Sequence, residues 1–158
     1  MDLKILKTQL VMKIINQVSA GGIVFKKIYH LGSNIYDLTW LICQHSQHKG
    51  WVFPKGFVGD KDKNETNETA AIREVEEEGG IKAKIINPEP IISKYEYQFG
   101  GVLYKKTVYY FLMEYVSGDP KNHDFEMSDA KFVSQDEVKK TLTYDSDKEA
   151  FEKILQGL

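Results

Sequence analysis

Alternating apolar and polar residues predict three β-strands in the first third of the chain. These segments are rich in aromatic and β-branched residues and are bounded by glycine, asparagine or proline: "SAGGIVFKK" (19–27), "YDLTWLICQHS" (36–46) and "WVFPKG" (51–56). Gly32 and Asn34 lie between the first two segments and indicate a hairpin. We expect the third strand to stop at Pro54 and Gly56, because proline cannot donate a sheet hydrogen bond.

A polar loop then leads into a helix that we expect from Thr66 to about Gly79. Thr66 is a favoured N-cap residue, and Glu68 lies in the first turn, where the helix dipole favours a negative charge. Gly79 and Gly80 end the helix, since glycine readily adopts the left-handed conformation of a C-terminal cap.

Two longer strands and two short helices complete the pattern. The strands are predicted at 91–99 and 104–116 and are joined through Gly100-Gly101. Two capping boxes predict the helices: Ser134 with Glu137, and Ser146 with Glu149. The order of strands, helix, strands and helices indicates a mixed α/β (α+β) protein with a largely antiparallel or mixed sheet.

Composition narrows the class of protein. A chain of 158 residues makes one domain, and a net charge of −2 gives no basic field for nucleic acid or anionic membranes. No apolar run reaches membrane-spanning length, and lysines interrupt the N-terminal segment 1–16, which we expect to be a strand or helix at the domain edge. Cys43 alone excludes a disulfide framework and is expected to be a buried strand thiol. We therefore expect a cytoplasmic protein with no obligate protein partner.

The predicted helix at 66–79 carries an unusual concentration of carboxylates. At 100° per residue, Glu74, Glu77 and Glu78 share one face, whereas Glu76 points toward solvent. Converging carboxylates repel one another, and a hard divalent cation such as Mg²⁺ or Mn²⁺ would remove that penalty. Arg73, four residues before Glu77, can pair with that carboxylate. An isolated acidic run, however, is more often a solvated helix face.

The wider pattern favours the metal site. Reading outward from the helix, nine positions over 23 residues match the Nudix signature G-x5-E-x7-R-E-U-x-E-E-x-G-U: Gly59, Glu65, Arg73, Glu74, Val75, Glu77, Glu78, Gly80 and Ile81. The chain therefore resembles the Nudix hydrolases, with a box at 59–81. The resemblance covers most of the chain and implies a single domain, residues 1–158, folded as an α/β/α sandwich with a mixed central sheet.

The resemblance also implies an activity and its ligands. Nudix hydrolases cleave a nucleoside diphosphate linked to another group, using water and magnesium or manganese. Glu74, Glu77 and Glu78 would bind the metal, with Glu74 or its neighbour Glu77 as the candidate general base and Arg73 supporting the catalytic carboxylates. The substrate would be a small-molecule nucleotide.

One departure from the family pattern concerns the box glycine. In many members this glycine ends a "P-[GK]-G" stretch, and the preceding carbonyl binds metal. Here that stretch is "FPKG", ending at Gly56, which places three extra residues before Glu65. We expect the Lys55 carbonyl to be the ligand and Gly56 to allow close backbone approach, with Gly59 matching the spacing within a lengthened loop.

Within the family, "WVFPKG", "KTVYYFLMEY" and "DAKFVSQDEV" look most like diadenosine tetraphosphate (asymmetrical) hydrolases. That likeness implies a further carboxylate for metal binding or catalysis, Glu126, six residues before Phe132. It also implies that Phe99, seven residues before Lys106, stacks on adenine.

Substrate contacts beyond these are less specific. Lys55 and Lys106 are expected to contact phosphates as point charges. Tyr95, Tyr97 and Phe99 alternate along one strand and therefore share a face. Tyr97 is a candidate substrate contact. If the shared face is instead part of the core, these aromatic side chains are packing residues. His45, His48 and His123 are interpreted as surface histidines.

Two other functions stay open. The substrate could be the 5′-triphosphate end of RNA, an oxidised nucleotide or a diphosphoinositol polyphosphate, although the RNA and inositol substrates would favour a more basic surface than this chain offers. A catalytically silent Nudix-fold binding module is the alternative of another class, and loss of box carboxylates would mark it. All of them are present.

Overall fold

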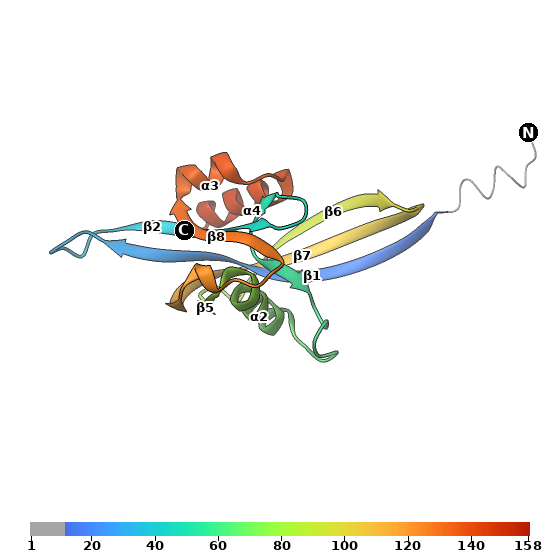
Figure 1. Ribbon diagram of the computed structural model, residues 1–158, viewed down its shortest axis with the longest axis horizontal. Helices are drawn as coiled ribbons and strands as arrows, with labels where there is room; N and C mark the ends of the chain where they lie inside the picture. Colours follow the sequence, from blue (N-terminus) through green and yellow to red (C-terminus); the bar gives the residue numbers. More distant parts are fainter. Residues whose placement is uncertain (1–11) are drawn as a thin grey trace, which may run out of the picture.

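The computed structural model describes residues 12–158, which form one mixed sheet with helices on both faces (Figure 1). The first half comprises β1 (Lys13–Tyr29), β2 (Tyr36–His45), β3 (Trp51–Val52), β4 (Lys55–Phe57) and α2 (Asn67–Gly79). The second half comprises β5 (Ile81–Ile85), β6 (Ile91–Phe99), β7 (Val102–Gly118), a short 3₁₀ turn η1 (Pro120–Asn122), β8 (Met127–Ser134), α3 (Gln135–Thr141) and α4 (Asp145–Gln156). The predicted fold class, an α/β/α sandwich with a mixed sheet, is confirmed.

Strand β1 organises the sheet because it changes partner along its length. It runs parallel to β7 from Lys13 to Phe25, while on its other edge it pairs first with β4 at Ser19–Gly21 and then with β2 from Phe25. Antiparallel pairing of β5 and β6 with β7, and of β3 and β8 with β2, completes the sheet. Strands β4 and β2 therefore pair with different parts of β1 and separate from each other along that edge.

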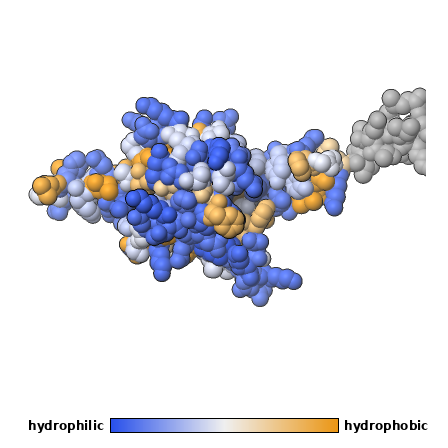
Figure 2. All heavy atoms as spheres, in the orientation of Figure 1, coloured by the Kyte–Doolittle hydropathy of each residue, from blue (hydrophilic) through white to orange (hydrophobic). Residues whose placement is uncertain are grey.

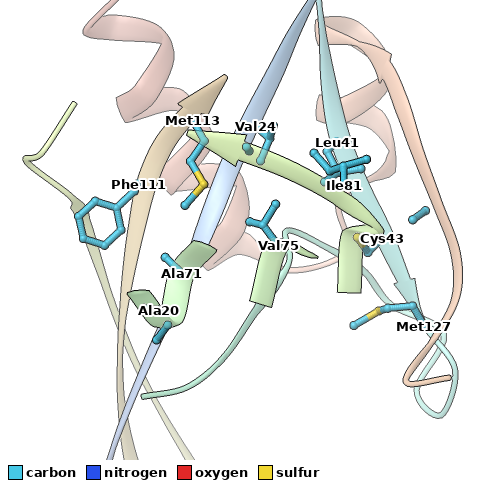
Figure 3. Packing of buried hydrophobic residues seen from close by; sticks show 13 residues of the cluster. Ala20, Val24, Leu41, Cys43, Ala71, Val75, Ile81, Phe111, Met113 and Met127 are labelled. Atoms are coloured by element: carbon cyan, nitrogen blue, oxygen red, sulfur yellow. The ribbon is translucent and has the colours of Figure 1, made fainter. Parts of the chain in front are cut away.

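Two apolar cores lie on opposite faces of this sheet. On one face, Ala71 and Val75 of α2 pack against Val24, Leu41 and Met113 (Figure 3). The helix approaches so closely that a Cβ atom added at Gly22 would lie 2.6 Å from Val75 Cγ2. On the other face, Phe151 of α4 packs edge-to-face against Trp40, with ring centroids 5.1 Å apart. The burial of Ala70, Ala71 and Val75 fixes which face of α2 lies against the sheet.

The ends of several elements agree with the capping signals. Thr66 accepts a hydrogen bond from the Thr69 N–H at the start of α2, and Gly80 adopts the left-handed conformation at its end. Ser134 likewise caps α3. The prediction of a cap at Ser146 is wrong: α4 begins at Asp145 after Tyr144, which provides no side-chain cap hydrogen bond. Cys43 is fully buried in β2, as predicted.

Other expectations about the strands need correction. The segment 51–56 is two strands, since the Pro54 carbonyl accepts the Gly22 N–H and redirects the chain from β2 toward β1. Strands β1 and β7 extend beyond the predicted ranges 19–27 and 104–116. Strands β5 and β8, of five and eight residues, were not predicted. Residues 1–11 of the N-terminal segment lie outside the described residues, and its remainder opens β1.

The long strands project beyond the α/β/α body at both ends of the molecule (Figure 1). The β1–β2 hairpin carries the exposed Leu31 and Ile35 at its tip, and apolar residues also show at the opposite end (Figure 2). Within residues 12–158, none of the helices has the length and apolar character needed to cross a membrane.

Replacing Phe151 by alanine tests the α3–α4 core. The side chain is 1% exposed and contacts both Trp40 and Phe53, so its removal should lower the free energy of unfolding by about 3–5 kcal/mol. Phe125→Ala is the matched control, because Phe125 is 89% exposed and its loss should change stability by less than about 0.5 kcal/mol. Urea denaturation with an unchanged m value measures both, and equal effects would contradict this core assignment.

Candidate functional site

A cavity of about 920 Å³ opens where β4 separates from β2. Its walls come from the acidic face of α2, the β4 strand, the middle of β6 and β7, the β2–β3 loop and the first turn of α4. The cavity therefore gathers side chains that lie far apart in the sequence.

The acidic face of α2 forms one end of the cavity. Glu74 and Glu78 are each only 5% exposed, Glu77 is half-buried, and Glu76 faces solvent as predicted. Burial raises the pKa of Glu74 to about 7, opposed by the neighbouring Arg73, and raises the pKa of Glu78 to about 8, opposed by the Lys55 N–H. Ionisation of these carboxylates is therefore costly unless a cation lies beside them, and without a cation they tend to stay protonated.

Arg73 is the main counter-charge of this cluster. Its Nη1 donates to Glu74 at 2.7 Å and to Glu77 at 3.2 Å, so the predicted pair with Glu77 forms. Its Nε and Nη2 donate to both oxygens of Glu65, at 2.8 and 3.0 Å, and Nη2 also donates to the Phe57 carbonyl. The guanidinium thus ties the loop after β4 to the acidic helix.

The two candidate box glycines have different surroundings. A Cβ atom at Gly56 would lie 2.2 Å from the Glu74 carboxyl group, so any larger residue would displace this carboxylate from its present position. Gly59 has φ +83° and donates its N–H to Glu65, which fixes the lengthened loop. The backbone N–H of Lys55 donates to Glu78 at 3.1 Å.

The carboxylates suit a hard cation but do not yet enclose one. Among residues 12–158, no three acidic, histidine or cysteine side chains are close enough together to form a ready ligand set. The guanidinium of Arg73 occupies one oxygen each of Glu74 and Glu77. Their oxygen-only chemistry, like charge and burial nevertheless fit Mg²⁺ or Mn²⁺.

Glu126 lies beside this cluster, on the loop that precedes β8. It lines the cavity, and its charge raises the pKa of both Glu74 and Glu78. The Asp124 N–H donates to the Glu77 carbonyl at 2.8 Å, and Asp124 Oδ1 accepts the Glu126 N–H. The loop is therefore fastened to the C-terminal end of α2.

Most of the predicted substrate contacts also reach the cavity. Lys55, Lys106 and Tyr97 line it, together with Tyr95. Burial and the nearby charge of Lys55 lower the pKa of Lys106 to about 8, although Glu78 opposes the shift. The Lys106 ammonium also lies 4.7 Å from the centre of the Phe57 ring.

Phe99 is the exception among these residues. It is 75% exposed at the end of β6, where the β6–β7 hairpin projects beyond the helices (Figure 1), and it is absent from the cavity lining. The structure therefore does not bring Phe99 to the site, and Tyr95 and Tyr97 are the aromatic residues of β6 that line it.

The cavity residues that were not predicted as site residues include His45, His48, Tyr144 and Asp147. The two histidine rings stack with centroids 4.1 Å apart, and the Tyr144 hydroxyl lies 3.1 Å from His48 Nδ1. The spacing of the histidines after a strand could have indicated them. No local signal marks the Tyr144 and Asp147 positions, since α4 brings them in from the end of the chain.

Comparisons with known proteins agree with this architecture. The NUDIX domain family matches residues 33–154. A protein of Mycobacterium tuberculosis (strain CDC 1551 / Oshkosh), whose provisional name is mutator protein MutT4, is 30% identical over 137 residues, or 84% of this chain. The chain spans about half (52%) of the length of that relative.

Solved structures share the fold at lower identity. A diadenosine tetraphosphate (Ap4A) hydrolase of C. elegans, crystallised as a binary complex, superposes with a TM-score of 0.64 at 24% identity over 90% of this chain and 99% of its own. The NUDIX domain of Shewanella oneidensis NrtR, complexed with ADP ribose, gives a TM-score of 0.64 at 17% identity over 90% of this chain and 88% of its own. These likenesses support the fold.

Glu78→Gln should stabilise the metal-free protein at alkaline pH. The folded-state pKa of Glu78 is raised from 4.5 to about 8, so between these values the folded protein binds more protons than the unfolded chain, and stability falls as pH rises. With a chelator at pH 8, the substitution should raise the free energy of unfolding by at least about 1 kcal/mol. Thermal or urea unfolding across this pH range measures the effect. Glu76→Gln, on the exposed face, is the control and should change nothing, and equal curves for all three proteins would contradict the burial argument.

Proposed function

The chain belongs to the Nudix family, and from this premise we propose that it is a metal-dependent pyrophosphohydrolase that cleaves diadenosine tetraphosphate to ATP and AMP. The observation that carries the proposal is the composition of one cavity. Box carboxylates lie at one end, two lysines lie beside them, and aromatic side chains from β6 and from the β2–β3 and α4 segments line the remainder.

The acidic end would hold Mg²⁺ or Mn²⁺ through Glu74, Glu77 and Glu78, with Glu126 and the Lys55 carbonyl as further oxygen donors. When bound, the cation would polarise the phosphoryl oxygens and lower the pKa of a coordinated water. Gly56 would keep the backbone close to Glu74, and Arg73 would hold the orientation of Glu74 and Glu77 from the side away from the substrate.

Hydrolysis requires one proton transfer and one bond exchange. The water oxygen bonds to phosphorus as the anhydride P–O bond breaks, which leaves ATP and AMP when the cleaved anhydride is the one nearest an adenosine. We assign Glu74 as the base that takes the water proton, because its carboxylate lines the cavity together with Glu77 and Glu78, the other residues that would hold the cation. Glu77 is the alternative base.

The lysines and aromatic residues would position the rest of the substrate. Lys55 and Lys106 would contact the phosphates as compact positive charges. Because the pKa of Lys106 is lowered to about 8, a phosphate beside it would favour the charged form and bind best below that pH. Tyr95 and Tyr97 on one wall, and His48 and Tyr144 on another, offer ring faces on which adenine can stack.

The charge of the cavity favours this substrate over the more anionic alternatives. Its acidic lining residues outnumber its basic ones: Asp60, Glu74, Glu77, Glu78, Glu126, Asp145 and Asp147 against Lys55, Lys61 and Lys106. A diphosphoinositol polyphosphate needs a strongly basic pocket, and the 5′ end of RNA favours a basic path leading away from it. A nucleotide flanked by two aromatic walls fits better.

Product analysis on a substrate panel tests the proposal. The panel is diadenosine tetraphosphate, triphosphorylated RNA, oxidised dGTP and a diphosphoinositol polyphosphate, each with magnesium or with a chelator. We expect ATP and AMP from the dinucleotide in magnesium and no products in the chelator. Turnover of another panel member alone would contradict the substrate assignment but support metal-dependent hydrolysis of an anhydride. Silence across the panel from a folded, metal-binding protein would favour a binding module.

Glu78→Gln should lower turnover by about 100-fold or more, because the loss of a metal-binding carboxylate removes several kcal/mol of transition-state stabilisation. Glu76→Gln should keep at least about half of wild-type activity, since this side chain faces solvent on the same helix. Initial rates with magnesium, on proteins whose thermal unfolding confirms the fold, measure both variants. Near-normal activity of the Glu78 variant would contradict the assignment of Glu78 as a metal ligand.

A further inference from the structure

Asp147 is a carboxylate of the cavity that the hydrolytic site does not use. It lies in the first turn of α4, outside the box, and is only 3% exposed while lining the cavity. The Tyr110 hydroxyl donates to its Oδ1 at 2.7 Å, and the Phe53 N–H is its other donor. Tyr110 itself is 1% exposed, so this part of Asp147 is anchored in the core.

The Asp147 carboxylate can accept more hydrogen bonds than these two donors provide. An ionised carboxylate can accept about four hydrogen bonds, so capacity remains for donors that enter from the cavity. Burial raises the pKa of Asp147, while the charge of Lys55 and the Tyr110 hydrogen bond oppose that shift. Because desolvation of a carboxylate is costly, a further donor from a bound molecule would offset a penalty that the empty cavity leaves in place.

The surroundings of Asp147 fit the edge of a purine. Tyr144 precedes the helix on the same side, Tyr95 lines the cavity from β6, and both offer ring faces. The start of α4 has no side-chain cap at Tyr144, so backbone N–H groups of its first turn are available as donors close to the carboxylate. An acceptor beside such donors complements adenine, which carries an amino donor at position 6 next to the N1 acceptor. Hypoxanthine presents the reverse pattern, a carbonyl next to an N–H.

We propose that Asp147 determines base specificity, its carboxylate accepting a hydrogen bond from the 6-amino group of the adenine stacked in this part of the cavity. The inference rests on the proposed function for its substrate class. Asp147 would recognise the base through this hydrogen bond and take no part in bond cleavage. With Oδ1 already bound by Tyr110, one amino group suits the remaining capacity better than the two adjacent donors of guanine.

The test compares diadenosine tetraphosphate with di-inosine tetraphosphate, which differ at the base edge alone. Wild-type protein should prefer the adenosine compound by about 10-fold to 100-fold in kcat/KM, the range for one well-placed polar contact to a base. Asp147→Asn should bring that ratio to about one or below, because an amide can turn a donor toward the 6-carbonyl group. The main effect should appear in KM.

Asp145→Asn is the matched control. Asp145 lies on the same helical turn and lines the same cavity, but its side chain is 94% exposed, so the substitution should leave the ratio unchanged. A loss of preference in both variants would overturn the assignment to Asp147. A wild-type preference for di-inosine or diguanosine tetraphosphate would overturn the assignment to a 6-amino group.

Equilibrium binding separates this inference from the proposed function. Calorimetric titration with AMP and with IMP, in a chelator, needs neither turnover nor metal. Tighter binding of AMP by the wild type, lost in Asp147→Asn, would uphold the role of Asp147 even if no dinucleotide were cleaved. Equal binding of AMP and IMP by the wild type, or no binding of either, would overturn the role of Asp147. This outcome is measured on the wild type alone, so it does not depend on whether the variant folds.

Discussion

Burial of two carboxylates from one helix, Glu74 and Glu78, against the backbone of β4 is the constraint on which the site depends. Gly56 allows the approach to Glu74, and the Lys55 N–H binds Glu78. Arg73 then offsets part of the like charge and, through Glu65, holds the lengthened loop. The helix can tolerate this arrangement because its other face, with Ala71 and Val75, is fully buried in the core (Figure 3).

The split in the sheet turns this acidic face into one wall of a cavity. Because β1 pairs with β4 at one end and with β2 further along, side chains between these strands are not covered by a neighbouring strand. The N-terminal end of α4 and the middle of β6 close the other sides. Acidic, basic and aromatic groups from distant parts of the chain are thereby brought together.

Local signals in the sequence were sufficient for the helix and its acidic face. Thr66, Gly80 and the spacing of the glutamates each act within a few residues, so α2 and the exposure of Glu76 could be predicted. The cavity walls depend on packing over long distances: Tyr144 and Asp147 face β6 only because α4 packs on the sheet. Phe99 shows the same limit, since alternation placed it on the face of Tyr97 but could not indicate that the strand runs beyond the cavity.

The parallel pairing of β1 with β7 also has a consequence for the order in which the protein folds. Lys13 pairs with Val102 and Phe25 with Glu114, so each contact joins residues 89 positions apart (102 − 13 and 114 − 25). Closing so long a loop costs entropy before any contact forms, and such pairings slow folding. Since β1 also holds β4, and with it Lys55 and Gly56, we infer that the acidic helix can form early but becomes a site only after β1 has taken its place in the sheet.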